Sequence, residues 1–415
     1  MSALRSAAAA LGLLAGPAPH AAAPVSDAAL ALHRRLLVVD SHIDTARLLE
    51  QPGWDILERH DAARDLSQLD EPRLREGGLG AAFWAIYTPP GSRDPQGRAA
   101  AAEHGLAQLM RLNDLVARHP AQFGLALGSD EARRIAADGR HAVFISMENA
   151  EPLASDPELL DAYWRHGLRM LGLVHASNND LADSATDAPE WQGLSPAGRA
   201  LVRRANCLGM LVDASHASDE VFDQLLERSP VPIVLSHSAS RALTDHRRNL
   251  DDARLLRLAQ HGGVLQLALY SSYLSQKKDD PRRAAALQPL YAQLRRMAGL
   301  QPAEYRALAA QIGEVERRYP KAQASLDDFM AHLLHVLKLI GPEHVGIGSD
   351  WDGGGGVAEL PDVSQLPRIT ERLMQAGYDE AQIAAIWGGN LLRLLDRAQA
   401  FPAAEAEPDA NGYCR

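Results

Sequence analysis

The sequence predicts a (β/α)8 barrel of the TIM type, an α/β fold in which parallel strands alternate with helices. Short apolar segments rich in β-branched residues recur along the chain, and helix-like stretches separate them. Near-continuous apolar strands between helices are typical of a parallel sheet that is covered on both faces. The eight strands that we expect are Leu36–Asp44, Ala81–Tyr87, Ala142–Glu148, Leu168–His175, Gly209–His216, Pro232–His237, Gly263–Tyr270 and Val345–Asp350.

Helices are predicted between and after these strands. Two of them begin behind a serine in the N-cap position, Ser195 before Pro196 and Ser218 before Asp219, where the side chain can accept from a free backbone N–H. The clearest helical stretches are Arg98–Arg118, Pro196–Asn206, Asp219–Glu227, Asp251–Gln260 and Asp362–Gln375.

A long insertion from Ser271 to His344 separates the seventh strand from the eighth. Loops longer than about 15 residues usually carry structure of their own. We therefore expect two or three helices here, which cap the barrel mouth. The domain organisation that follows is one barrel domain over residues 24–400 and a polar tail over residues 401–415.

The N-terminus has the order of a secretory signal peptide over residues 1–23. Arg5 precedes the apolar run Ala7 to Gly16, and the small residues Ala21 to Ala23 follow. An Ala-rich tail without a secretory role is the alternative. No later run approaches the ~20 apolar residues of a membrane span, and the C-terminus lacks a lipid-anchor signal. We expect a soluble, secreted or periplasmic protein without a stable membrane anchor.

Charge and cysteine content exclude some functions. The net charge of -11 and the lack of a long Lys/Arg run argue against nucleic acid as a partner. The two cysteines cannot supply the main framework of so long a chain. Cys207 is expected to be a small buried residue rather than a nucleophile, and a bridge between Cys207 and Cys414 stays open.

The ends of the predicted strands carry most of the chemistry. Enzymes with this fold place their catalytic residues at the C-terminal ends of the strands. Six of the eight predicted strands end on a residue that can bind a metal or transfer a proton. In chain order these residues are His42 and Asp44, Glu148, His175, His216, His237 and Asp350.

Together these strand ends predict a site for two metal ions. Residues two apart on a strand face the same side, so His42 and Asp44 can reach one ion. His216 and His237 can hold a second ion, with Glu148 shared, at a separation of ~3.5–4 Å. Imidazole and carboxylate ligands suit Zn²⁺, and Mn²⁺ or Co²⁺ are possible substitutes. Each histidine alone is more typical of a satisfied polar core residue; the combination favours the metal site.

A rival metal motif is His332 with His335 in the insertion. It lacks the spacing that places two histidines and a glutamate base on one helix face. We interpret both residues as ordinary parts of a helix.

Seven distinctive segments follow one another in order along the chain: Val39–Thr45, Ser146–Asn149, Gly193–Pro196, Leu235–Ser238, Arg247–Asn249, Gly346–Asp350 and Gly388–Leu391. They resemble the signature segments of the membrane (renal-type) dipeptidase family of zinc dipeptidases. The resemblance extends from about residue 36 to about residue 395. It implies a secreted bacterial member with a barrel of the metal-dependent, amidohydrolase-like hydrolase kind.

The resemblance implies a metal-dependent dipeptidase that attacks the peptide bond with a hydroxide bridging two zinc ions. It implies that His42 and Asp44 hold one zinc, that His216 and His237 hold the other, and that Glu148 bridges both. It also implies a homodimer.

The resemblance further assigns the groups that act on the substrate. His175 contacts the scissile carbonyl and the developing oxyanion, Arg248 receives the C-terminal carboxylate of a dipeptide, and Asp350 handles the proton. A guanidinium fork matches a carboxylate in geometry, whereas Arg247 beside it is expected to be a bystander. Tyr270, at the end of the seventh strand, and part of the loop Ala176–Gly193 are expected to line the substrate pocket.

Two other classes of function remain as alternatives. One is another binuclear barrel hydrolase, such as a TatD-like nuclease, a deaminase or another amidohydrolase, although these usually open with H-x-H rather than His42-x-Asp44. The other is a periplasmic binding protein that keeps the barrel without the chemistry. Such a protein is expected to have lost a ligand or an acid–base residue, and none is missing here.

Overall fold

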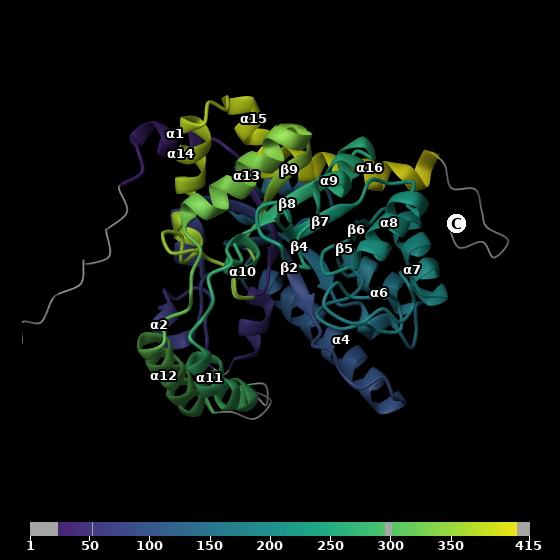
Figure 1. Ribbon diagram of the computed structural model, residues 1–415, viewed down its shortest axis with the longest axis horizontal. Helices are drawn as coiled ribbons and strands as arrows, with labels where there is room; N and C mark the ends of the chain where they lie inside the picture. The colour runs from purple at the N-terminus through teal and green to yellow at the C-terminus, as the bar shows by residue number, and fades with distance from the viewer. Residues whose placement is uncertain (1–23, 52, 295–300, 405–415) are drawn as a thin grey trace, which may run out of the picture.

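Eight parallel strands form the wall of a nearly closed barrel in the computed structural model, which describes residues 24–51, 53–294 and 301–404 (Figure 1). Backbone hydrogen bonds from Asp350 to His42 (3.1 Å) and from Asp44 to Trp351 (2.8 Å) connect the last strand to the first. The predicted barrel is confirmed. In sheet order the strands are β1 (Val38–Ile43), β2 (Leu79–Tyr87), β4 (His141–Glu148), β5 (Leu168–Gly172), β6 (Leu211–Asp213), β7 (Val234–Ser238), β8 (Val264–Ala268) and β9 (Val345–Gly348).

Each predicted segment contains a strand, but several predicted C-terminal ends were wrong. His175, His216, Tyr270 and Asp350 lie in loops beyond their strands. His216 and Asp350 have φ angles of 66° and 64°, which extended backbone does not adopt. A short strand, β3 (Phe123–Leu125), pairs with β4 and was not predicted. It has only three residues, one of them a glycine, so its sequence signal is weak.

Helices cover the outside of the barrel and close the end at which the strands begin. The predicted continuous helix Asp362–Gln375 was wrong: a 3-10 turn precedes α14, and Pro367 at the start of α14 has no N–H to donate to an earlier carbonyl. The α-helices are α1 (Asp27–His33), α2 (Ala62–Asp65), α3 (Glu71–Gly77), α4 (Pro95–Arg118), α5 (Ser129–Ala137), α6 (Leu159–Arg165), α7 (Pro196–Cys207), α8 (Asp219–Arg228), α9 (Asp252–Gln260), α10 (Ser271–Leu274), α11 (Pro281–Leu294), α12 (Pro302–Arg318), α13 (Leu326–Ile340), α14 (Pro367–Gln375), α15 (Glu380–Ala384) and α16 (Asn390–Ala404). The short elements are η1 (Thr45–Glu50), η2 (Glu151–Leu153), η3 (Pro342–His344), η4 (Val363–Gln365) and the π-helical η5 (Ala385–Gly389).

The insertion between β8 and β9 contains α10 to α13. Helix α12 packs against both α11 and α2 at one side of the molecule (Figure 1), and a small apolar cluster there includes Leu287 and Ile312. Helix α13 instead packs beside α9 and carries His332 and His335. His332 accepts from the backbone N–H of Ser240 at 3.2 Å, and His335 pairs with Asp252. Both histidines are therefore ordinary helix residues.

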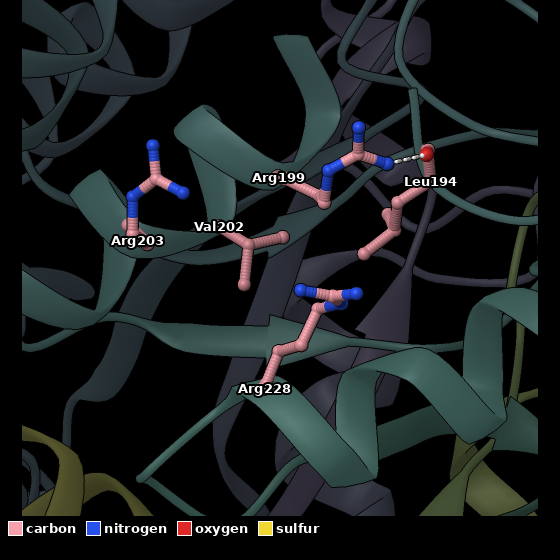
Figure 2. Close-up of a pocket in the computed structure, with 5 residues that line it drawn as sticks. All are labelled: Leu194, Arg199, Val202, Arg203 and Arg228. Atoms are coloured by element: carbon pink, nitrogen blue, oxygen red, sulfur yellow. Dashed lines mark hydrogen bonds between the residues drawn. The ribbon is translucent and has the colours of Figure 1, made fainter. Parts of the chain in front are cut away.

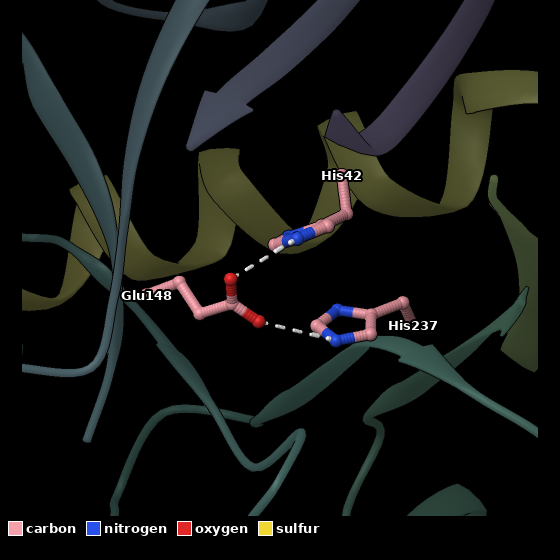
Figure 3. Close-up of side chains that lie close together, drawn as sticks. All are labelled: His42, Glu148 and His237. Carbon is pink, nitrogen blue, oxygen red and sulfur yellow. Dashed lines mark ion pairs between the residues drawn. The ribbon is translucent and has the colours of Figure 1, made fainter. Parts of the chain in front are cut away.

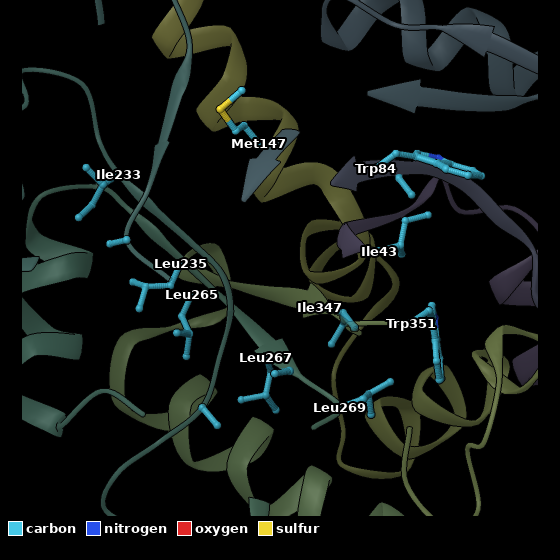
Figure 4. Packing of buried hydrophobic residues seen from close by; sticks show 14 of the residues in the cluster. Ile43, Trp84, Met147, Ile233, Leu235, Leu265, Leu267, Leu269, Ile347 and Trp351 are labelled. Atoms are coloured by element: carbon cyan, nitrogen blue, oxygen red, sulfur yellow. The ribbon is translucent and has the colours of Figure 1, made fainter. Parts of the chain in front are cut away.

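Alternation along the strands divides the apolar residues into two layers. Along β2, Ala81 and Phe83 belong to the cluster that includes α16, whereas Ala82 and Trp84 belong to the layer against the outer helices. Figure 4 shows part of this outer layer, with Trp84 near Ile43. Each large apolar side chain buried in this way contributes roughly 1.5–3 kcal/mol.

The terminal predictions fall on residues whose structure is not described. The predicted signal peptide, residues 1–23, and Cys414 lie outside the described residues, whereas Cys207 is disulfide-bonded. Among the helices that the structure describes, none combines the length and apolar composition of a membrane span.

A buried histidine at the N-terminal end of β4 makes the free energy of unfolding depend on pH. His141 donates from Nδ1 to the Leu79 carbonyl at 3.0 Å and accepts from Trp84 Nε1 at 3.1 Å, so it is neutral. Burial lowers the pKa of His141 from 6.5 to about 4. As the pH falls below 6.5, the unfolded chain takes up a proton that the folded chain does not, and stability falls by about 1.4 kcal/mol per pH unit.

We predict that His141→Gln removes this dependence, because glutamine can make both hydrogen bonds without titrating. Urea unfolding at pH 7 and pH 5 should show a loss in wild type that exceeds the variant's loss by about 2 kcal/mol. Equal losses in the two proteins would contradict the assignment.

Candidate metal centre

Three imidazoles converge on the buried carboxylate of Glu148 at the end of the barrel where the strands finish. The Nε2 atoms of His216 and His237 lie 3.0 and 3.4 Å from Glu148 Oε1, and His42 Nε2 lies 3.7 Å from Oε2. Figure 3 shows His42 and His237 on the two sides of the carboxylate. His175 lies farther out, with Nε2 at 4.0 Å from Oε1. Glu148 therefore joins side chains that come from four parts of the chain.

Strand irregularities turn two of these histidines toward Glu148. The pairing of β1 with β2 shifts register between Asp40 and Ile43, and the pairing of β7 with β8 shifts between Leu235 and Ser238. His42 and His237 lie within these shifted stretches. A bulge re-aims a side chain that strict alternation would direct elsewhere, so regular strands would not give the same site.

The electrostatics of the cluster favour a bound cation. Burial lowers the pKa of His216 and His237 well below 6.5, and the charge of Arg248 lowers both further. Both rings are therefore neutral, and their Nε2 atoms lie 2.9 Å apart in a hydrogen bond that a bound cation would replace. Burial alone would lower the pKa of His42 too, but the carboxylates of Glu148 and Asp44 raise it to about 10. Positive charge is thus stabilised between these carboxylates.

The donor atoms fit metal coordination. Three sets of ligand atoms lie within 4.8 Å of one another among the described residues: His42 with Glu148 and His237, Glu148 with His175 and His216, and His42 with Asp44 and Asp350. His42 Nε2 and Asp44 Oδ1 are buried, and neither has a hydrogen-bond partner in the described part of the chain. Orphaned atoms of this kind are costly unless an ion satisfies them.

Asp350 contacts the metal-ligand cluster from the loop after β9. It shares a hydrogen bond with Asp44, and burial together with the charge of Asp44 raises its pKa well above the usual value. The approach of the loop is close: a Cβ on Gly353 would lie 2.0 Å from Asp44 Oδ2 and 2.1 Å from Asp350 Oδ1, so this position requires glycine.

The cluster opens into a cavity of about 820 Å³. Tyr270 lines it, as predicted, and its ring stacks on Tyr273 at 4.5 Å between centroids. From the loop Ala176–Gly193, only Ala176 and Thr186 are among the lining residues. The polar residues of that loop instead hold its shape, as Asp183 does by accepting from three backbone N–H groups.

A second hollow of about 280 Å³ lies between α7 and α8 (Figure 2). Its lining residues are Leu194, Arg199, Val202, Arg203 and Arg228. No residue of the metal-ligand cluster lines this second hollow. The chemistry therefore belongs to the larger cavity.

Arg248 is a buried cation in the wall of the larger cavity. It is only 5% exposed, its Nη2 donates to the His237 carbonyl at 3.1 Å, and its guanidinium lies 5.2 Å from the Tyr273 ring centroid. Its Nε is buried without a hydrogen-bond partner, and no carboxylate of the described residues pairs with it. A buried guanidinium without an anionic partner is a binding site for an anion.

Comparison with known proteins identifies the family. The model of the membrane dipeptidase family (peptidase family M19) matches residues 26–409. Dipeptidase tcpJ of Claviceps purpurea is 29% identical over 374 residues, which are 88% of this chain and 78% of that protein. The chain belongs to the membrane dipeptidase family.

Solved structures of related proteins agree with this assignment. The probable dipeptidase PvdM from Pseudomonas aeruginosa has a TM-score of 0.73 and 30% identity, over 90% of this chain and 98% of that one. A metallopeptidase from Rhodobacter sphaeroides, liganded with a phosphinate mimic of the dipeptide L-Ala-D-Ala, has a TM-score of 0.69 and 25% identity, over 88% and 99% of the two chains. The chain is a metal-dependent dipeptidase.

Sequence reasoning missed residues that support the metal ligands of this dipeptidase. Asp213, at the end of β6, accepts from the N–H groups of Ser215 and Ser236 at 2.9 Å each and from the Ser236 hydroxyl. That hydroxyl lies 2.9 Å from His237 Nδ1, so Asp213 orients His237 through Ser236. The one available signal was a buried-type strand that ends on an aspartate just before His216.

We predict that Asp213→Ala lowers metal affinity about 10- to 100-fold, as loss of an outer carboxylate does at other metal sites. Titration against a chromophoric chelator measures the affinity. Asp130→Ala, which removes a carboxylate that is 91% exposed on α5, is the matched control and should bind as wild type does. Equal affinity of the Asp213→Ala and control proteins would remove this role.

Proposed function

We propose that this dipeptidase hydrolyses dipeptides that carry a free C-terminal carboxylate and that it uses two divalent ions. One observation carries the proposal. A carboxylate shared by three imidazoles lines the same cavity as a buried guanidinium that has no carboxylate partner among the described residues. The first arrangement suits metal-assisted attack on an amide, and the second suits recognition of a carboxylate.

In this proposal His42 and Asp44 hold one ion, His216 and His237 hold the other, and Glu148 contacts both. Imidazole and carboxylate ligands favour Zn²⁺, with Mn²⁺ or Co²⁺ as substitutes. Bound divalent ions supply Lewis acidity, which lowers the pKa of water and polarises the scissile carbonyl.

The side chains around the ligands complete the reaction. As the water oxygen bonds to the carbonyl carbon, Asp350 accepts the water proton, and it returns that proton to the leaving nitrogen when the C–N bond breaks. Burial and the charge of Arg248 lower the pKa of His175 to about 4, so its neutral ring donates a hydrogen bond to the developing oxyanion. A donor in such a position contributes ~2.7–4 kcal/mol to other hydrolases. Arg248 holds the substrate carboxylate, and Tyr270 forms part of the wall.

We also propose that the protein is exported and forms a homodimer. The N-terminal pattern of residues 1–23 supports export, as does the disulfide at Cys207, because disulfides persist in oxidising compartments. N-terminal sequencing of the protein recovered outside the cytoplasm and sedimentation analysis test these two points.

We predict that chelation abolishes hydrolysis and that Zn²⁺ restores it, with close to two ions bound per chain. Glu148→Ala should lose both the second ion and more than about 1,000-fold in kcat, since one carboxylate serves both ions. Elemental analysis and dipeptide kinetics on the same samples measure these effects. Full activity in Glu148→Ala would overturn the site assignment.

We predict that Arg248→Ala lowers kcat/KM for a dipeptide about 10- to 200-fold, because a charge-assisted hydrogen bond is lost. The same variant should no longer distinguish a dipeptide from its C-terminal amide. Arg247→Ala is the matched control, since Arg247 is exposed and should keep wild-type discrimination. A persistent preference for the free acid in Arg248→Ala would mean that another group binds the carboxylate.

A further inference from the structure

The cavity contains a second cation, Arg47, that forms no ion pair with a described residue. Arg47 belongs to η1, which begins directly after the metal-ligand residue Asp44. It lines the cavity, is half-buried, and has a buried Nε without a hydrogen-bond partner in the described part of the chain. No carboxylate of the described residues lies within ion-pair distance of it.

Arg47 is not needed to neutralise the carboxylates near it. Its electrostatic neighbours include Asp44 and Asp352. Asp352 already accepts from the Thr45 hydroxyl at 2.5 Å and from the Gln68 N–H at 2.6 Å. Asp44 interacts with His42 and shares a hydrogen bond with Asp350. The guanidinium therefore remains available for a ligand.

The other cations of this cavity, apart from Arg248, are engaged. Arg283 pairs with Glu316 and with Asp279. Lys321 donates to the Gly354 carbonyl at 2.9 Å and lies 5.2 Å from the Tyr270 ring centroid. Among the lining Arg and Lys residues described here, only Arg47 and Arg248 have a buried guanidinium Nε without a hydrogen-bond partner.

Arg47 follows β1 and Arg248 follows β7, and in the sheet order these two strands lie on opposite sides of β4, which ends on Glu148. The charge of Arg248 acts on His175, His216 and His237. The charge of Arg47 acts on Asp44 and on two tyrosines of the insertion, Tyr291 in α11 and Tyr305 in α12, which also line the cavity. A dipeptide whose C-terminal carboxylate lies at Arg248 thus extends its N-terminal residue toward Arg47.

We propose that Arg47 binds a carboxylate on the side chain of the N-terminal residue, so that the enzyme prefers dipeptides that begin with Glu or Asp. This inference rests on the proposed function, since Arg248 fixes the orientation of the substrate. A guanidinium fork pairs with a carboxylate through two parallel hydrogen bonds, and the tyrosines of α11 and α12 form the wall beyond it.

The experiment compares kcat/KM for Glu-Ala and Gln-Ala, which differ in charge but scarcely in shape. Wild type should favour Glu-Ala at least about 10-fold, and Arg47→Met should reduce that ratio about 10- to 100-fold, the effect of one charged hydrogen bond. Arg47→Glu should favour Lys-Ala over Glu-Ala. Inhibition by free L-glutamate and L-glutamine gives a binding readout that does not depend on turnover, and the preference for glutamate should disappear with Arg47.

The matched control is Arg111→Met. Arg111 pairs with Glu50 at the end of the same 3-10 helix at 2.7 Å but does not line the cavity, so its Glu-to-Gln ratio should equal that of wild type. If Arg47→Met folds poorly, Arg47→Gln answers the same question. An unchanged ratio in the Arg47 variants, or a wild-type ratio near one, overturns this inference alone. Failure of the metal-loaded wild type to cleave any dipeptide overturns the proposed function as well.

Discussion

The carboxylate of Glu148 is the group on which the site depends. It is 7% exposed, and its burial raises its pKa to about 8. A buried anion is stable only when positive charge and hydrogen-bond donors surround it. Three imidazoles surround the carboxylate here, and the remaining demand for positive charge makes the site attractive to cations. Metal binding and folding are therefore linked, because the ligands that the ion needs are costly to bury without it.

Two buried aspartates hold the ligands in place by tying neighbouring strand ends together. Asp40 accepts from the N–H groups of His42 and Ser349, each at 3.0 Å, and so joins β1 to the end of β9. Asp213 joins β6 to β7 through Ser236 in the same manner. Below them the barrel is narrow: a Cβ on Gly348 would lie 1.8 Å from the Ser236 carbonyl oxygen. The metal ligands thus rest on a tightly packed layer whose backbone positions leave little freedom.

The features that depend on local sequence pattern could be predicted from the sequence alone. Apolar strands repeat along the chain with helices between them. The C-terminal ends of four of these strands carry or adjoin His42, Glu148, His216 and His237. In barrels of this type the C-terminal ends of the strands meet at one site, so these residues could be placed together. Tyr270 could be assigned to the cavity for the same reason. The exact strand ends could not be predicted, since the left-handed backbone of His216 and Asp350 depends on tertiary contacts. The bulges that aim His42 and His237 likewise arise from register with neighbouring strands.

Arg47 and Arg248 show why specificity is harder to predict than chemistry. The sequence around neither arginine distinguishes it from an ordinary surface residue. Arg247, directly before the buried Arg248, is exposed. What distinguishes the two cavity arginines is the absence of a described carboxylate partner, which only the folded chain reveals. Strand ends fix the reacting groups, whereas the segments after them and the helices α11 and α12 fix the charge and shape around the substrate. Changes in those segments can alter substrate preference without moving Glu148, because the ligand layer is held by its own hydrogen bonds.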